Sequence, residues 1–504
     1  MRAKQVKIAV AALCAAFCAA SFGKDFSISD FGAVADGRLC TKAFAAAIDA
    51  CAAAGGGRVT VPAGTWFTGS IRLKSNVELH LDDKAVVRFS DELADLLPAV
   101  MSTYEGVEVF GYCPLIYAYC CTNVAVTGGG LLTTDQTRWR QRQLFAEKDK
   151  GARALVAAYN AGVRAQKTPP EKRDVTVYGE TFVVRPHFIQ LNRCSGARLE
   201  GFRLRYSPFW FVEIFKSSDV VCRGVSVFGM FGNSDAFDVD SSQRVLIESC
   251  TIDTGDDAFA VKSGRDEDGR RLATPSQDVE IRNCHIVRSG GFVVIGSEIT
   301  GGAKNVLVHD CTAGVVRDVF VLRSDASRGG HVENITMRNC RVDRCQRWFF
   351  NTRSGWPVDP VRVVSMDRVR WTTYDKILVE NVVVGDCGQR MNIVGSPDAP
   401  YRGVVVRDCS IDSVRDTTNR VENVAADVSL DGLKVLGRAL PPRPRVSADD
   451  FLMAPDFDYA EIAARVPRSA YLVHKPVKDK AEENIRWKRF SNLRRCGWEI
   501  VVEK

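Results

Sequence analysis

The chain has 504 residues, is 46% hydrophobic and carries a formal net charge of +7 at pH 7. This length and apolar content suffice for a large core. The small basic excess suits an acidic polysaccharide but is more typical of a solvated surface, and without a long basic run or zinc-type cysteine pairs it gives no reason to expect nucleic acid as a partner.

Residues 1–23 have the pattern of a signal peptide. Arg2, Lys4 and Lys7 precede an apolar run from Ile8 to Ala20, which is too short to span a bilayer. We therefore expect a secreted or periplasmic protein with no membrane span. Of the 17 cysteines, those outside this segment are odd in number, which predicts at least one free thiol or intermolecular bridge.

The first elements of the mature chain predict a strand and a helix. Phe26–Phe31 alternates as a strand, and Thr41–Ala54 has helical periodicity with Thr41 as N-cap and Gly55 to Gly57 as the stop. An amphipathic helix before a solenoid is expected to cap its first coil.

From Asn123 onward a strand pattern repeats with loops of unequal length. One small or apolar position recurs in it, at Gly129, Phe202, Cys250, Cys284, Cys311, Cys340, Val382 and Cys409. Constant strands with variable loops predict an all-β fold, a single-stranded right-handed parallel β-helix, over residues 24–437. In such a column the cysteines are expected to be buried apolar residues and neither zinc ligands nor disulfides.

Two segments leave this pattern. Residues 136–182 are predicted to be a helical and loop insertion, with the helical part at 136–165. The tail at 438–504 is expected to pack on the β-helix or to cover its last coil.

The acids concentrate between Phe231 and Ser263. The motif that starts at Asp235 returns at Asp257, 22 residues later, as expected of successive coils. Such coils place Asp235 and Asp257 about 4.8 Å apart in one column, with Asp256 beside them. Three crowded carboxylates are costly for stability, which predicts a functional site.

Later rungs extend the comparison. DAFDVDS, DAFAVKS, GGFVVIG and DVFVLRS align as four rungs, with an inward stack of phenylalanines and two further columns; the stack is Phe237, Phe259, Phe292 and Phe320, and the columns are Asp235, Asp257, Gly290, Asp318 and Asp240, Lys262, Ile295, Arg323. Asp240 and Lys262 are expected to pair. Asp238 and Asp240 lie opposite Phe237, where they either bind sugar or form a solvated face.

These motifs resemble glycoside hydrolase family 28, the polygalacturonases and their relatives. Asn233-Ser234-Asp235 is similar to the family's Asn-Thr-Asp motif, and Gly255-Asp256-Asp257 to its Gly-Asp-Asp motif. Gly296-Ser297-Glu298 and Arg328-Gly329-Gly330 extend the resemblance, which runs from about Phe26 to about Ser413.

The resemblance implies an inverting hydrolase of a pectic, uronic-acid-containing polysaccharide or oligosaccharide. Asp256 is then the general acid, and Asp235 and Asp257 hold and deprotonate the water. Candidate substrate-binding residues are Asn233, Lys262, Arg323 and Asp238. We expect no metal, no cofactor and a monomer.

Two family positions differ. The histidine of the family's Gly-His-Gly motif falls on Gly290, or on Ser289 if one residue is skipped, and its Arg-Ile-Lys motif falls on Val321-Leu322-Arg323. In the family these basic residues grip the sugar carboxylate at the cleavage point, so the substrate is expected to differ from plain polygalacturonate.

Two alternatives stay open. A pectate-lyase-like enzyme on the same fold would use the acids to hold calcium and Lys262 or Arg323 as base. A non-catalytic glycan-binding relative would keep the groove without turnover. Trp348 and Trp356 are either sugar-stacking platforms or packing residues.

Overall fold

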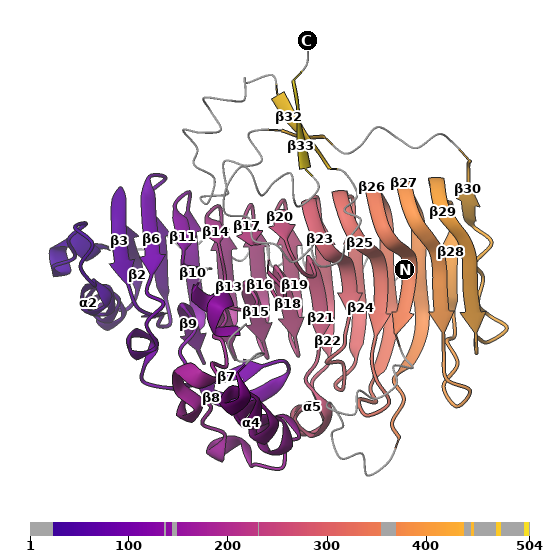
Figure 1. Cartoon of the computed structure of the whole chain (residues 1–504). Coiled ribbons are helices and arrows are strands. Elements are labelled where there is room, and N and C mark those ends of the chain that lie inside the picture. Colours follow the sequence, from indigo (N-terminus) through magenta and orange to yellow (C-terminus); the bar gives the residue numbers. More distant parts are fainter. Residues whose placement is uncertain are drawn as a thin grey trace.

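The computed structural model describes residues 24–135, 138–143, 149–229, 231–353 and 369–437, and three short tail strands at 445–447, 470–474 and 498–502. Here the chain winds into a parallel β-helix, whose stacked coils run across Figure 1. Successive coils add strands to three parallel ladders. The predicted all-β parallel β-helix is confirmed. The signal segment, Trp356 and most of the tail lie outside the described residues.

The three ladders share the same parallel pairing from coil to coil. The first ladder begins with β1 (Asp25–Ser27), β2 (Gly57–Val61), β5 (Val77–Leu81), β10 (Thr122–Gly128), β13 (Ser195–Glu200), β16 (Ser218–Arg223), β19 (Gln243–Glu248), β22 (Ser276–Arg282) and β24 (Ala303–His309). The second begins with β3 (Gly64–Thr68), β6 (Ala85–Phe89), β11 (Leu131–Thr133), β14 (Arg203–Arg205), β17 (Ser226–Gly229) and β20 (Thr251–Thr254). The third begins with β4 (Ile71–Arg72), β9 (Ile116–Tyr119), β12 (Ile189–Asn192), β15 (Val212–Phe215), β18 (Phe237–Asp240) and β21 (Phe259–Lys262).

In the later coils, single strands bend to serve more than one ladder. These coils are built from β23 (His285–Ile295), β25 (Thr312–Arg323), β26 (His331–Arg353), β27 (Thr373–Val394), β28 (Val404–Arg407), β29 (Cys409–Glu422) and β30 (Leu433–Val435). Because β25 carries both the end of one ladder and the start of the next, it delivers two separate side chains to the site described below.

A helix lies beside the first coils, α2 (Thr41–Ala53), at the indigo end of Figure 1. Its buried residues Phe44, Ile48 and Cys51 belong to the core. The N-cap differs from the prediction: Cys40 precedes the helix, and the Thr41 hydroxyl instead accepts a hydrogen bond from the Gly69 amide at 2.7 Å. The predicted strand at 26–31 divides into β1 and the 3₁₀ helix η1 (Ile28–Phe31).

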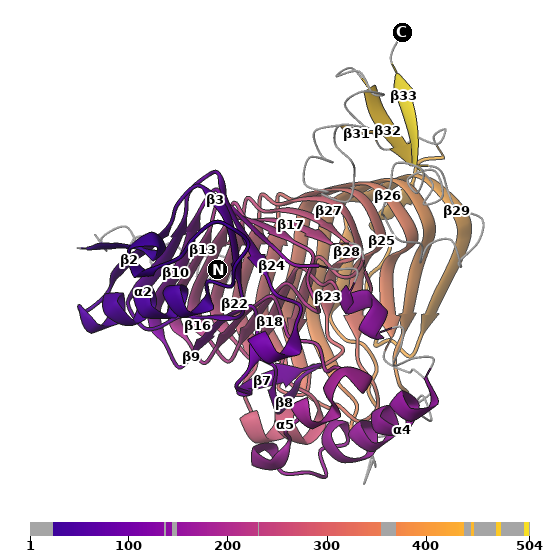
Figure 2. The same ribbon diagram turned by 60° about the vertical axis from the view of Figure 1, so that its left-hand side comes forward.

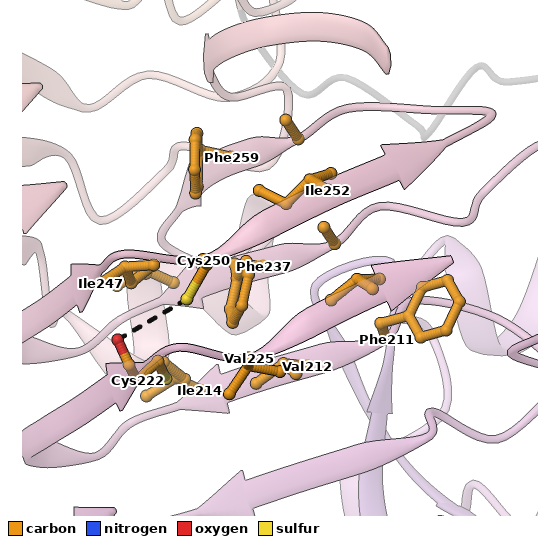
Figure 3. Close-up of a cluster of buried hydrophobic side chains, with 14 of the residues drawn as sticks. Phe211, Val212, Ile214, Cys222, Val225, Phe237, Ile247, Cys250, Ile252 and Phe259 are labelled. Atoms are coloured by element: carbon orange, nitrogen blue, oxygen red, sulfur yellow. Dashed lines mark hydrogen bonds between the residues drawn. The ribbon is translucent and has the colours of Figure 1, made fainter. Parts of the chain in front are cut away.

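The core fills the inside of the coils. Figure 3 shows part of it, where Phe237 and Phe259 stack with ring centroids 6.0 Å apart and Cys250 lies against the Cys222 carbonyl. The 14 described cysteines are free, and all but Cys120 are buried. They behave as apolar core residues, as predicted.

The column that holds these cysteines differs from the predicted one in two places. It begins at Gly130, one residue after the predicted Gly129. It also contains Val225, from a coil that the repeat comparison passed over. Val382 pairs with Cys340 as predicted.

Several excursions gather on one side of the β-helix, below the ladders in Figures 1 and 2. They include an antiparallel hairpin, β7 (Val100–Tyr104) and β8 (Val107–Gly111), which the sequence analysis missed. The helical elements there and nearby are η2 (Leu93–Leu96), helical residues 138–143, α4 (Lys150–Tyr159), the π-helix η3 (Asn160–Arg164), η4 (Pro170–Lys172), η5 (Thr176–Thr181) and α5 (Asp266–Leu272).

The tail contributes one described feature, an antiparallel sheet of β31 (Arg445–Ser447), β32 (Ala470–His474) and β33 (Trp498–Val502). How the tail contacts the β-helix lies outside the described residues. Among the described helices, none is both long and apolar enough to cross a bilayer.

Candidate active site

Three aspartates meet where the second ladder turns into the third. Asp235 precedes β18, and Asp256 and Asp257 precede β21. Phe237 pairs with Phe259, and the Ala236 amide donates to the Asp257 carbonyl at 2.9 Å, so the predicted shift of 22 residues is the real register. One carboxylate oxygen of each aspartate lies within 4.8 Å of those of the other two. The sequence therefore predicted this cluster correctly.

The three carboxyl groups differ in their preferred charge. Burial raises the pKa of Asp235 well above its usual range, and the neighbouring Asp238 and Asp256 raise it further. Burial, together with the charge of Asp257, also raises the pKa of Asp256, although its Oδ2 accepts a hydrogen bond from the Asn233 amide at 2.9 Å. Both groups favour the protonated form.

Asp257 has the opposite preference. Burial alone would raise its pKa, but the charges of Arg323, Arg317 and Lys262 outweigh that effect and lower it. Its Oδ2 lies 3.1 Å from Nη2 of Arg323, and its Oδ1 lies 3.4 Å from Nη2 of Arg317. The Gly291 amide donates to Oδ1 at 2.8 Å. Asp257 is therefore the ionised member of the cluster.

Gly291 has to be glycine for this arrangement. A Cβ at that position would lie 2.9 Å from Oδ1 of Asp257 and 2.2 Å from a methyl group of Val294. A side chain would push the carboxylate away from its amide donor, so the close approach depends on the missing Cβ.

Lys262 and Asp238 lie beneath the cluster, with 1% and 0% of their surface exposed. The Lys262 ammonium lies 3.3 Å from Glu298 and 3.5 Å from Asp238, and 4.4 Å from the centre of the Trp210 ring. Burial keeps the pKa of Asp238 well above its usual range, whereas Lys262 and Arg265 hold that of Glu298 well below it despite burial. Glu298 is therefore the ionised partner of Lys262.

Asp240 does not pair with Lys262 as predicted. Its Oδ1 accepts hydrogen bonds from the Gly264 amide and the Ser241 hydroxyl, both at 2.8 Å. Asp238 and Asp240 are fully buried, so a solvated strand face is wrong. The β7–β8 hairpin explains part of this burial: Thr103 bonds Glu213, which pairs with Asp238 in the ladder, and Gly106 packs against Glu298.

Asn233 holds the loop before Asp235. Its backbone is left-handed, with φ at 60°, and its side-chain oxygen accepts a hydrogen bond from Nη2 of Arg185 at 3.0 Å. The Arg185 guanidinium also lies over the Phe209 ring, 5.1 Å from its centre. This loop therefore links Asp256 to a buried arginine that the sequence analysis did not identify.

The later columns are displaced by one residue from the prediction, because a β-bulge between Ile252 and Asp253 shifts the register. Gly291, not Gly290, follows Asp257 in the column and pairs with Asp318. Phe259 pairs with Val293, and Gly296 replaces Ile295 between Lys262 and Arg323, although Phe292 stays 6.5 Å from Phe259.

Gly290 lies beside Asp256, whose carbonyl accepts a hydrogen bond from the Gly290 amide at 2.8 Å. The missed residue Arg317 fills the neighbouring space, and Val321 is buried. Arg317 immediately precedes Asp318, as Asp256 precedes Asp257, so extending each rung by one residue toward its N-terminus would have found it.

A cluster of three carboxylates is also a set that hard divalent cations favour. Here Arg317 and Arg323 already contact Asp257 and neutralise it from within the protein. Internal ion pairs thus account for the charge of the cluster, and we assign no metal to it.

Comparison with known proteins places this geometry in a family. The sequence profile of Glycosyl hydrolases family 28 matches residues 179–430, which include all three aspartates. The chain belongs to glycosyl hydrolase family 28. It is therefore a glycoside hydrolase, an enzyme acting on O-glycosyl bonds.

Individual family 28 proteins resemble the chain over most of its length. A protein named "Probable polygalacturonase" from Vitis vinifera is 26% identical over 76% of this chain and 74% of its own. The exo-poly-alpha-D-galacturonosidase of Dickeya chrysanthemi is 26% identical over 63% of this chain, which spans 54% of that relative. The crystal structure of an exopolygalacturonase from Thermotoga maritima has a TM-score of 0.69 and 29% identity, covering 80% of this chain and 92% of its own.

Proposed function

We propose that this family 28 enzyme hydrolyses a glycosidic bond in a pectic, uronic-acid-containing polysaccharide or oligosaccharide, with inversion at the sugar carbon. The observation that carries the proposal is the opposite pKa shift of two adjacent carboxyl groups, raised for Asp256 and lowered for Asp257. General acid and general base catalysis need one carboxyl in each state at the same pH.

In this mechanism Asp256 donates its proton to the oxygen of the leaving sugar. The Asp257 carboxylate takes a proton from the attacking water, whose oxygen forms the new bond to the sugar carbon as the old glycosidic bond breaks. Asp235 helps to hold that water, since its buried Oδ1 has no hydrogen-bond partner in the described part of the protein.

The substrate-binding residues divide into two groups. Arg323 is 23% exposed and offers guanidinium N–H groups to a sugar carboxylate or hydroxyl, and Asn233 flanks Asp256. Lys262 and Asp238 are buried, so we propose that they support the acids from below. The relatives' names point to α-linked galacturonate as the first substrate to test.

The spacing of the carboxyl groups sets a sharp condition on inversion. Inverting enzymes generally hold their two carboxyl groups about 6.5–9.5 Å apart, and retaining enzymes about 5–5.5 Å. The nearest oxygens here lie within 4.8 Å. Inversion therefore rests on the family resemblance and requires the water to bind beside Asp235 and Asp257 rather than between distant carboxyls.

We further propose export to the periplasm or the medium, on the strength of the sequence at residues 1–23, and action as a monomer.

The deciding experiment compares the wild type with Asp256→Asn and Asp256→Ala on polygalacturonate, rhamnogalacturonan and side-chain oligosaccharides, counting released reducing ends. Both variants should lose activity by at least about 100-fold, whereas the control Asp219→Asn, which alters a remote pair with Arg244, should keep it. Unchanged turnover in the Asp256 variants would refute the assignment of the acid. An unsaturated product lost on chelation would favour a lyase, and binding without cleavage a non-catalytic protein.

A further inference from the structure

The Arg317 side chain enters the active site through space that a glycine leaves open. Its Nη2 would lie 3.2 Å from a Cβ built on Gly290, which is closer than most Cβ contacts. The same Cβ would lie 3.1 Å from the Asp256 carbonyl carbon. Any side chain at position 290 would therefore compete with the guanidinium for its place beside the acids.

The guanidinium is bound on two edges. Its Nε donates to Oδ2 of Asp318 at 3.2 Å, and its Nη2 donates to Oδ1 of Asp257 at 3.4 Å. Asp318 is fully buried and also accepts hydrogen bonds from the Trp348 amide and the Asn351 side chain, both at 3.3 Å. Asp318 thereby anchors the arginine, whose side chain remains 31% exposed toward the substrate side.

We propose that Arg317 is a positioning residue that fixes the Asp257 carboxylate for water activation, and that Gly290 is required to admit it. Arg317 holds one oxygen of Asp257 and Arg323 holds the other, so the carboxylate is oriented as well as charged. The inference rests on the three-aspartate mechanism proposed above.

The charges around Asp257 give the inference a distinct pH signature. Arg317, Arg323 and Lys262 face it as cations, and Asp235, Asp256 and Asp238 as acids. The charge of Arg317 lowers the pKa of both Asp257 and Asp256. Removing it should raise both pKa values, so the whole bell-shaped pH profile of activity should move to higher pH.

The test measures kcat/KM against pH for the full-length wild type and Arg317→Gln. We expect kcat/KM at the wild-type optimum to fall by about 10- to 100-fold and the acid limb to rise by about one pH unit or more. Arg317→Lys should recover part of both changes, and free guanidinium ion should partly rescue Arg317→Ala. The control Arg244→Gln, in a remote ion pair with Asp219, should leave the profile unchanged.

Gly290→Ala provides a second variant that keeps the arginine. It should shift the profile in the same direction but by less, and Gly290→Ala should add no further shift to Arg317→Gln, because both act through one contact. A folded Arg317→Gln enzyme with an unshifted profile, or additive shifts, would overturn the inference. A wild type inactive on every pectic substrate would instead overturn the proposed function.

Discussion

Replacing Lys262 by methionine tests whether the ground beneath the acids is held by charge. The ammonium is 1% exposed, and its ionised partner Glu298 lies 3.3 Å away. Two unit charges at that distance attract by about 5 kcal/mol at an effective dielectric constant of about 20. Part of this is returned, since methionine avoids the cost of burying the ammonium and Glu298 keeps Arg265 at 3.0 Å.

Truncating one partner of a buried ion pair generally costs about 3–5 kcal/mol, and these offsets place Lys262→Met near the lower end, at about 3 kcal/mol. With an unfolding entropy of about 2.1 cal/mol/K per residue over the β-helix, this predicts a fall in Tm of roughly 3–4 °C. Differential scanning calorimetry at pH 7 measures it.

The control is Lys376→Met, which removes a 52% exposed ammonium from its pair with Glu333 and should cost less than about 1 kcal/mol. If Lys262→Met melts within about 1 °C of the wild type, the buried pair contributes nothing net and the reasoning is wrong.

Two further substitutions probe the same region. Burial, and then the charge of Glu213, raises the pKa of Asp240 to about 7, so between about pH 4 and pH 7 the native state keeps a proton that the unfolded state has lost, and stability falls by up to about 4 kcal/mol as pH rises. Asp240→Asn removes this term, so its Tm relative to the wild type should rise from pH 4 to pH 8 in thermal melts; a constant difference would contradict the shift. In Gly296→Ala, a Cβ would lie 1.8 Å from the Arg323 carbonyl oxygen at a φ of 103°, which should displace Arg323 and lower kcat/KM by at least about tenfold. Gly37→Ala, with a φ of 85° but nothing within 4 Å, is the matched control and should lose only stability, about 1–2 kcal/mol.

The sequence predicted those features that depend on repetition. Asp235 and Asp257 lie in one column because the strands that follow them alternate in the same phase, and a repeat displays that phase directly. The cysteine column follows from the same periodicity. Where the period is interrupted, as by the bulge after Ile252, counting along the sequence places Gly290 and Ile295 one residue away from their true neighbours.

The burial of Asp238 and Asp240 could not be predicted in this way. Alternation shows that they leave the core side of the strand, but it does not show what covers the other side. The β7–β8 hairpin comes from far earlier in the chain, and its turn at Glu105-Gly106, with positive φ at both residues, was the available signal. Arg317 was missed for a related reason, since the rung comparison began at Asp318.

The most direct test of the proposed mechanism is the configuration of the first product. NMR spectroscopy during hydrolysis of an α-linked galacturonate oligosaccharide should show the β anomer of the newly formed reducing end before mutarotation mixes the two forms. Initial release of the α anomer would show retention, in keeping with carboxyl oxygens within 4.8 Å of one another, and would contradict direct attack by water held at Asp235 and Asp257.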